Sequence, residues 1–235
     1  GGKFGYAIPL ILLVTAASWY FPRSLGVALF TFLGLLLIIN LGFWLATIET
    51  LTLVLFATIV SVLVGVPIGI AAAHRPWLYT AIRPILDLMQ TIPTFVYLIP
   101  ALILFGLGMV PGLIATVIFA IPAPIRLTRL GIISTPPSLV EAAQAFGATP
   151  GQVLRKVELP FAMPQIMAGL TQTIMLSLSM VVIAALVGAK GLGVPVVRAL
   201  NTVNISMGFE AGLCIVILAI ILDRLFRSSD EGDAK

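Results

Sequence analysis

The chain has 235 residues, of which 60% are apolar and only 9% are charged, with a formal net charge of +4. Soluble domains are about 45–50% apolar and about 25% charged, so 13 basic and 9 acidic side chains are too few to solvate a globule of this size. This composition argues against a soluble enzyme, a disordered chain and a nucleic-acid binder. A mean hydropathy of +1.17 indicates a polytopic membrane protein instead.

Uncharged or nearly uncharged apolar runs of roughly membrane-spanning length recur along the whole chain. A spanning helix needs about 20 mostly apolar residues, and lipid tolerates only helices or closed barrels. The runs are continuous rather than alternating, which excludes a barrel. We therefore predict an all-α polytopic membrane protein with about seven transmembrane helices. The predicted spans cover residues 4–21, 25–46, 51–73, 90–110, 113–133, 163–187 and 209–222.

The spans divide the chain into three predicted parts. Residues 1–48 hold two N-terminal helices, which we interpret as an addition to a five-helix core over residues 49–227. Residues 228–235 form a polar tail. The first span resembles a secretory signal in position, but it has no small-residue cleavage pattern before Arg23, so we expect it to be retained.

Lysine and arginine are distributed unequally between the two sides of the membrane. When the seven spans alternate, ten basic residues fall on one side and three on the other. Positive charge accumulates in cytoplasmic loops, so we predict an external N-terminus and a cytoplasmic C-terminus. The cytoplasmic group is Arg23, Arg75, Arg83, Arg126, Arg129, Arg155, Lys156, Arg224, Arg227 and Lys235, and the external group is Lys3, Lys190 and Arg198.

One polar loop, residues 136–160, is too polar to span the membrane and has strong helix signals. Ser138 and Glu141 have the spacing of a capping box, which predicts a helix starting at Leu139. One face of this helix carries small and apolar side chains at i, i+3, i+4 and i+7. These are Leu139, Ala142, Ala143 and Phe146.

The second half of the same loop repeats the start signal. Gly147 stands where a left-handed C-cap belongs. Thr149, Pro150 and Gln152 then predict a new helix start, which must end before Pro160. The sequence thus predicts two short helices with a bend at Gly147. Their apolar face either docks into a partner's groove or packs back onto the chain's own helix ends.

The loop resembles the EAA loop of ABC-importer permease subunits. Glu141-Ala142-Ala143 is followed after three residues by Gly147 and after nine more by Val157-x-Leu159-Pro160, with valine in place of the family's isoleucine. Residues 83–98, 162–169, 191–193 and 220–224 are similar to the permeases of glycine betaine/proline betaine importers. The resemblance covers roughly residues 45–227 and implies the MetI-like core of type I ABC importers.

This resemblance implies an importer made of several subunits in a bacterial or archaeal plasma membrane. Two permease subunits, expected as a homodimer, form the path, two cytoplasmic ATPase subunits hold the EAA loops, and an external binding protein delivers the substrate. ATP and Mg²⁺ would be bound by the ATPase. The resemblance assigns ATPase coupling to Glu141, Ala142, Ala143, Phe146, Gly147, Leu159 and Pro160.

The residues themselves agree with a transport subunit that is not an enzyme. The chain contains no G-x4-G-K-[ST] phosphate loop, so we expect no ATP hydrolysis by this chain. His74 and Cys214 are its only histidine and cysteine, which leaves no Ser/His/Asp or Cys/His catalytic set and no metal cluster. We expect no cofactor in this chain and no nucleic-acid partner.

Candidate residues of the translocation path are polar or aromatic groups within the spans. An aromatic face can attract a quaternary ammonium by about 0.5–2 kcal/mol, and polar side chains in lipid usually face the bundle or a cavity. The alternative role for the polar side chains is hydrogen bonding between helices. No ionisable residue is predicted deep in a span. The candidates are Gln90, Thr91, Phe95, Tyr97, Gln172 and Ser179.

Two further patterns concern helix contacts. Gly65 and Gly69 flank Pro67 with the spacing that permits close helix approach, and we favour ordinary packing over a path role. Pro122 and Pro124 interrupt the fifth span and free backbone carbonyls.

The sequence therefore favours the permease of an ATP-driven importer for glycine betaine, proline betaine or choline. Two alternatives stay open. One is a permease for another small solute, such as an amino acid or a sulfonate. The other is a secondary carrier or channel that works alone.

Overall fold

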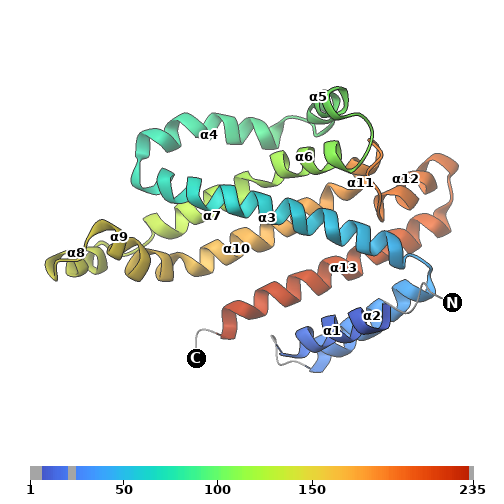
Figure 1. Cartoon of the computed structure of the whole chain (residues 1–235), viewed down its shortest axis with the longest axis horizontal. Coiled ribbons are helices and arrows are strands. Elements are labelled where there is room, and N and C mark those ends of the chain that lie inside the picture. The colour runs from blue at the N-terminus through green and yellow to red at the C-terminus, as the bar shows by residue number, and fades with distance from the viewer. Residues whose placement is uncertain (1–6, 21–24, 233–235) are drawn as a thin grey trace.

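The structure is a computed structural model that describes residues 7–20 and 25–232, and every regular element in this part of the chain is a helix (Figure 1). This confirms the all-α prediction. Four helices are long and apolar enough to cross a membrane, and a bent pair raises the number to five. Two shorter apolar helices at the N-terminus complete a count that roughly agrees with the predicted seven.

The first two helices form a hairpin that packs on the last helix. α1 covers Ala7–Tyr20 and α2 covers Leu25–Asn40, while predicted residues 4–6 and 21 lie outside the described part. α2 ends before the predicted Ala46 because Gly42 turns the chain with a φ of +79°. Gly34 lets α2 approach α13, since a Cβ there would lie 2.7 Å from Ile217 Cγ2.

α3 (Trp44–His74) is the longest helix at 31 residues and contains the predicted third span. Its glycine pair contacts α7. A Cβ on Gly65 would lie 2.7 Å from Pro124 Cγ, and one on Gly69 would lie 2.7 Å from the Ile125 carbonyl oxygen. This agrees with the packing role favoured for the pair.

The bounds predicted for the fourth span, residues 90–110, are wrong. The chain instead forms α4 (Pro76–Thr91) and α5 (Phe95–Phe105), which meet at 92°. Pro93 forces its predecessor out of helical geometry, and Ile92 is extended with φ −69° and ψ 132°. α4 therefore runs back beside α3 and carries residues that the sequence placed before the span.

The next helices return across the bundle and lead into the polar loop. α6 (Met109–Ala120) and α7 (Pro122–Ile133) form one membrane-length run, with Pro122 in the first turn of α7, where proline is tolerated. The loop holds α8 (Pro137–Ala145), α9 (Pro150–Val153) and the π-helical turn η1 (Leu154–Glu158).

The C-terminal third completes the bundle. α10 (Leu159–Ser179) and α11 (Val181–Ala185) contain most of the predicted sixth span. α12 (Gly193–Thr202) turns the chain into α13 (Ile205–Gly232), which contains the predicted seventh span and reaches into the predicted tail. Residues 233–235 lie outside the described part.

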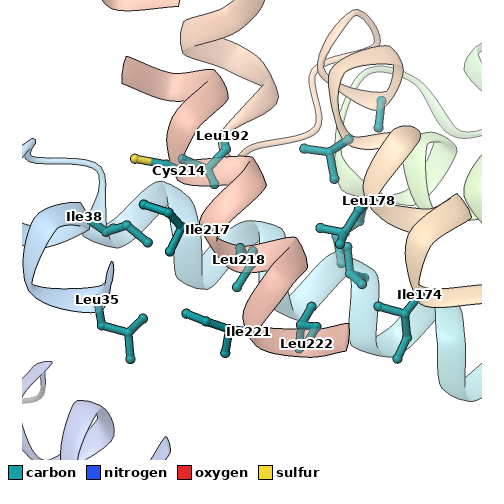
Figure 2. Packing of buried hydrophobic residues seen from close by; sticks show 14 of the residues in the cluster. Leu35, Ile38, Ile174, Leu178, Leu192, Cys214, Ile217, Leu218, Ile221 and Leu222 are labelled. Carbon is teal, nitrogen blue, oxygen red and sulfur yellow. The ribbon is translucent and has the colours of Figure 1, made fainter. Parts of the chain in front are cut away.

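The core joins the hairpin to the rest of the bundle through α13. Figure 2 shows Leu35 and Ile38 of α2 on one side of Ile217 and Ile221, with Leu178 and Ile174 of α10 beyond the other side. These side chains are almost completely buried, and burial of a large aliphatic side chain contributes about 1.5–3 kcal/mol. α13 is thus held between two layers of helices.

The two ends of the bundle differ in content. One end holds the C-terminal end of α3 with α8 and α9, and the opposite end holds α12 and the start of α3 (Figure 1). Lys190 and Arg198 line a common cavity with Glu49 at that opposite end. Of the basic residues in the described part of the chain, Lys190 and Arg198 thus lie at the end with α12, whereas Arg83 lies within α4 and Arg126 and Arg129 lie within α7.

Candidate functional site

The polar loop projects from the bundle as a helix with an open face. No residue of α8 is buried, Leu139 is 47% exposed, and Phe146 is 93% exposed. Ala142 is exposed and Ala143 is half-buried. The predicted apolar face is therefore not covered by the described part of the chain. An exposed phenylalanine beside two alanines is typical of a protein contact site.

The start of α8 differs from its prediction. The helix begins at Pro137 and Pro136 is the N-cap, without a hydrogen bond from a capping side chain. The predicted capping box of Ser138 and Glu141 is wrong, because a proline already has the φ needed at the first helical position and starts the helix two residues earlier. Glu141 is exposed and has no bonding partner among the described residues, so its carboxylate is open to solvent.

The bend at Gly147 is a Schellman motif, as the glycine predicted. Gly147 has a φ of +80°. Its N–H donates to the Gln144 carbonyl at 2.8 Å, and the Ala148 N–H donates to the Ala143 carbonyl at 3.1 Å. These two bonds satisfy carbonyls that the helix end leaves free. They fix the direction in which the chain leaves α8.

The segment after the bend begins as predicted but ends differently. Thr149 and Gln152 form the predicted capping box, with the Thr149 N–H donating to Gln152 Oε1 at 2.8 Å. The predicted end before Pro160 is wrong, since helix continues from Pro150 to Ala185. The π-helical turn accommodates the proline: the Leu159 N–H reaches back to the Leu154 carbonyl, and Pro160 lies in the first turn of α10, where its missing donor costs least.

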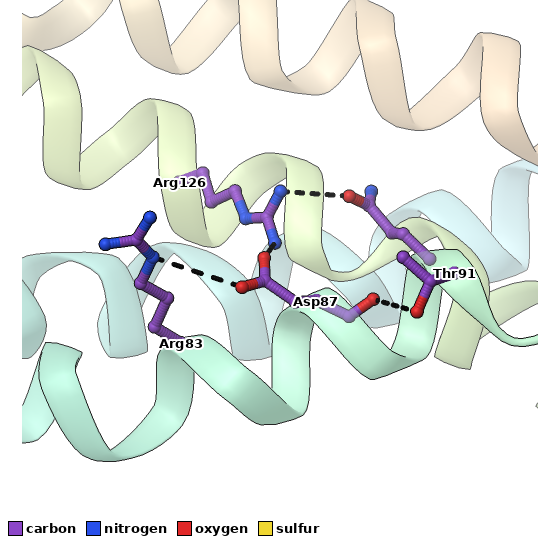
Figure 3. A network of polar contacts seen from close by, with 5 residues as sticks. Arg83, Asp87, Thr91 and Arg126 are labelled. Carbon is purple, nitrogen blue, oxygen red and sulfur yellow. Dashed lines mark hydrogen bonds and ion pairs between the residues drawn. The ribbon is translucent and has the colours of Figure 1, made fainter.

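A charged seam joins α4 to α7 (Figure 3). The Arg126 guanidinium donates to Asp87 Oδ1 at 2.6 Å and to Gln90 Oε1 at 3.0 Å. Arg83 lies 4.0 Å from the other Asp87 oxygen. One turn further along α7, the Arg129 guanidinium lies 3.6 Å from the centre of the Tyr79 ring. Such pairing reduces the cost of placing charge within a membrane helix bundle.

This seam was not predicted from the sequence. The sequence placed Arg83 and Asp87 before a span starting at Gln90, whereas the structure places them inside α4. The charges are separated by 39 residues in the chain, so no local pattern links them. The four-residue spacing of Arg83 and Asp87 on one helix was the only sequence signal.

The predicted path residues at the bend have distinct roles. Tyr97 places its hydroxyl on the carbonyls that end α4, donating to Met89 and, at 3.0 Å, to Ile92. Thr91 is exposed and donates to the Asp87 carbonyl at 2.9 Å. Phe95 is 52% exposed. Tyr97 therefore holds the bend closed, while Phe95 is the aromatic ring of this group that is open to a ligand or a neighbour.

The predicted path residues of α10 separate into an outer and an inner face. Gln172 and Ser179 are exposed and seven residues apart, which places them on one side of the helix. Thr173 and Ser177 are completely buried. The Ser179 hydroxyl donates to the Met175 carbonyl at 3.0 Å, which leaves its lone pairs free. The Thr173 hydroxyl donates to the Gly169 carbonyl of its own helix at 2.7 Å, and the buried Ser177 hydroxyl has no hydrogen-bond partner among the described residues.

A clamped glycine loop at the opposite end was not predicted. The Leu192 N–H donates to the buried Thr50 hydroxyl at 2.8 Å, and a Cβ on Gly191 would lie 2.6 Å from the same oxygen. The Gly108 N–H donates to the Val187 carbonyl at 2.8 Å. Gly188 and Gly191 both have positive φ. The sequence signal was the closely spaced Gly188, Gly191 and Gly193.

Among the described residues no group of three or more histidine, cysteine, aspartate or glutamate side chains could hold a metal ion. The arrangement has a helix with an uncovered face at one end of an apolar bundle and a charged, polar flank along it.

Comparison with protein families gives a match that covers most of the chain. Residues 65–232 match the family described as binding-protein-dependent transport system inner membrane component. The chain is 52% identical over 219 residues to the glycine betaine transport system permease protein OpuAB of Bacillus subtilis (strain 168), which covers 93% of this chain and 77% of that protein. It is 51% identical over 224 residues to the glycine betaine/carnitine transport permease protein GbuB of Listeria monocytogenes serotype 1/2a (strain 10403S), at 94% and 79% coverage.

Similarity to solved structures agrees with the observed fold. The structure matches an inward-facing conformation of the MetNI methionine ABC transporter with a TM-score of 0.68 and 26% identity, covering 77% of this chain and 93% of that one. An amino acid ABC transporter structure matches with a TM-score of 0.66 at 21% identity, over 85% of this chain and 98% of that one. The latter likeness concerns the fold alone.

Proposed function

The chain belongs to the family of binding-protein-dependent transport system inner membrane components, and from this premise we propose that it is the membrane-spanning permease of an ABC importer for a quaternary ammonium compatible solute. Glycine betaine, proline betaine and choline are the candidate solutes. The observation that carries the proposal is the 51–52% identity, over more than nine-tenths of the chain, to two permeases named for glycine betaine transport.

The work of import is divided among several proteins. ATP is hydrolysed by separate ATPase subunits, and a binding protein supplies the solute. In our proposal the ATPase, and not this chain, binds ATP and Mg²⁺. The binding protein docks on the end that carries α12, where Lys190, Arg198 and Glu49 line a cavity of about 350 Å³.

α8 is the proposed contact with the ATPase. Its exposed Phe146 and the Ala142–Ala143 face fit a groove on a partner protein, because small side chains permit close approach and an aromatic ring fills a pocket. Glu141 adds an unpaired carboxylate at the edge of this face. Gly147, Leu159 and Pro160 set the direction in which α8 leaves the bundle.

The proposed path runs along the polar flank of α4 and α10. Asp87 is 53% and Arg83 is 67% exposed in this single chain, and charged side chains are costly against lipid. Their flank therefore faces water or a second permease. We assign it to a water-filled path shared by two copies of this chain, with Thr91, Phe95, Gln172 and Ser179 as further lining groups.

The proposed orientation follows from the roles given to the two ends of the bundle. The end with α8 is cytoplasmic because the ATPase is reached there, and the end with α12 is external. The N-terminus is then outside and the C-terminus inside, in agreement with the basic residues of the loops.

Reconstitution with purified partners tests the proposed function. The chain, its ATPase and its binding protein are placed in proteoliposomes, and uptake of labelled glycine betaine, an amino acid and a sulfonate is compared. Uptake of glycine betaine that requires both ATP and the binding protein supports the proposal. Selective uptake of an amino acid or a sulfonate would assign another cargo, and uptake by this chain alone would assign a secondary carrier.

A further inference from the structure

A single polar contact ties the docking loop to the end of α3. His74 is the last residue of α3 and Glu158 is the last residue of η1. His74 Nε2 lies 2.9 Å from Glu158 Oε2, and the two residues are 84 positions apart in the chain. The Glu158 side chain is 12% exposed and that of His74 is 46% exposed. The contact is therefore partly shielded from water, at the base of the projecting loop.

The hydrogen-bond partners of His74 indicate which of its two ring nitrogens carry hydrogen. His74 Nδ1 lies 3.0 Å from the Ile70 carbonyl oxygen, which can only accept, so Nδ1 carries a hydrogen. Nε2 faces an oxygen of a carboxylate, which also only accepts when it is ionised. Both contacts are satisfied together when both ring nitrogens carry hydrogen. This places a positive imidazolium beside a negative carboxylate.

The surroundings offer Glu158 no other charged partner. A cavity of about 320 Å³ adjoins the pair and is otherwise lined by uncharged residues of α8, α9 and their connection: Val140, Gln144, Ala148, Pro150 and Val153. The nearby charged groups are Arg75, Glu141, Arg155 and Lys156, and none of them forms an ion pair within the described part of the chain. On α7, Arg126 and Arg129 face α4 instead, and the described α10 has no charged residue.

The His74–Glu158 contact lies where the projecting loop joins the helix bundle. η1 has the wider π-helical geometry, which is rare and is often found at functional positions. It connects the loop directly to α10, which packs along α3, and the His74–Glu158 contact joins it to the end of α3 as well. α3 in turn packs along α7, where Gly65 and Gly69 allow close approach.

We propose that His74 and Glu158 form a polar tie through which movement of the docking loop, residues 137–158, is passed directly to the end of α3. The two are positioning residues for transport, and this role rests on the proposed function. With the pair intact, movement of the loop reaches α3 at this contact as well as through the packing of α10 on α3.

The first test measures transport against ATP hydrolysis. In proteoliposomes that expose the ATPase to the bath, glycine betaine moved per ATP should fall about fivefold or more in His74→Gln and in Glu158→Gln. His74→Arg, which keeps a hydrogen-bond donor and a positive charge for Glu158, should keep the high ratio. Lys156→Gln, which removes an exposed charge from the same turn, should behave like the unmodified protein.

The second test does not depend on transport. A double-mutant cycle of His74→Gln and Glu158→Gln is measured by thermal unfolding of the purified chain in detergent. The cycle should give a coupling energy between the two positions that differs from zero. This result would stand even if the chain carried another solute, so failure of the tie and failure of the proposed function can be told apart.

Clear outcomes would overturn the tie. The first is a transport ratio in both glutamine variants equal to that of the unmodified protein, and the second is a His74→Arg variant as poorly coupled as His74→Gln. Absence of coupling in the unfolding cycle would do the same. If a single variant fails to assemble, the exchanged pair His74→Glu with Glu158→Arg decides: restored transport supports the tie, and no restoration contradicts it.

Discussion

Gly147 and Gly151 lie in the same loop, and a side chain at either would meet no atom within 4 Å, but only Gly147 has a positive φ of +80°. A left-handed conformation costs a residue with a Cβ about 1–2 kcal/mol. Gly147→Ala should therefore re-aim α8 and lower ATP-dependent uptake, whereas Gly151→Ala should leave uptake unchanged. Uptake and ATPase co-purification are measured for both variants, and equal uptake by the two would show that the bend direction does not matter.

The residues of the docking loop show how far local sequence predicts local structure. Gly147 was predicted because its Schellman bonds join residues at most five positions apart, and the Thr149–Gln152 capping box is equally local. The start of α8 was missed because two rules competed, and Pro137 at the first helical position prevailed over the spacing of Ser138 and Glu141. The His74–Glu158 contact had no local signal at all.

At the scale of elements, the approach of α3 to α7 depends on Gly69. Its Cβ would lie 2.7 Å from the Ile125 carbonyl oxygen and 2.8 Å from Thr128 Cβ, both on a helix that cannot easily give way. Gly69→Ala should destabilise the protein by about 1–3 kcal/mol, measured as thermal unfolding in detergent. The control Gly212→Ala on α13, where no atom lies within 4 Å, should not destabilise it. Equal stability of the two variants would contradict the close packing.

The seam between α4 and α7 should behave as one coupled unit. Asp87→Asn and Arg126→Gln each leave the other charge without its main partner, so the double variant should lose less stability than the sum of the singles. We expect a coupling energy of about 0.5–3 kcal/mol in a double-mutant cycle of thermal unfolding. Arg83→Gln is the control, because its exposed side chain lies 4.0 Å from Asp87 and such pairs contribute at most about 1 kcal/mol. Strict additivity of Asp87→Asn and Arg126→Gln would mean that the seam contributes nothing.

The helices were predicted unevenly, for a physical reason. Summed hydropathy located α3, the α6–α7 run, α10 and α13, because a long apolar helix is what lipid demands. Hydropathy carries no information about backbone direction, so the same sum missed the 92° turn between α4 and α5 at Pro93. It also treated Arg83 and Asp87 as loop charges, because the compensating Arg126 is distant in sequence and close only after folding.

At the scale of the whole molecule, opposite ends of the bundle should be reached from opposite sides of the membrane. In a Cys214→Ser background, Leu200→Cys should react with an impermeant thiol reagent added outside intact cells, because Leu200 is 71% exposed at the end with α12. Leu139→Cys, which is 47% exposed on α8, should react only after the membrane is opened. Labelling of Leu139→Cys from outside would reverse the proposed orientation.

The most direct test of the central claim compares hydrolysable with non-hydrolysable nucleotide. Proteoliposomes containing the chain, its ATPase and its binding protein receive ATP or a non-hydrolysable analogue on the ATPase side, and the initial rate of glycine betaine uptake is measured. The account predicts concentrative uptake with ATP, none with the analogue, and loss of uptake with intact membrane insertion for Ala143→Trp, whose bulk blocks docking of α8. Equal uptake with the analogue, or normal uptake by Ala143→Trp, would contradict it.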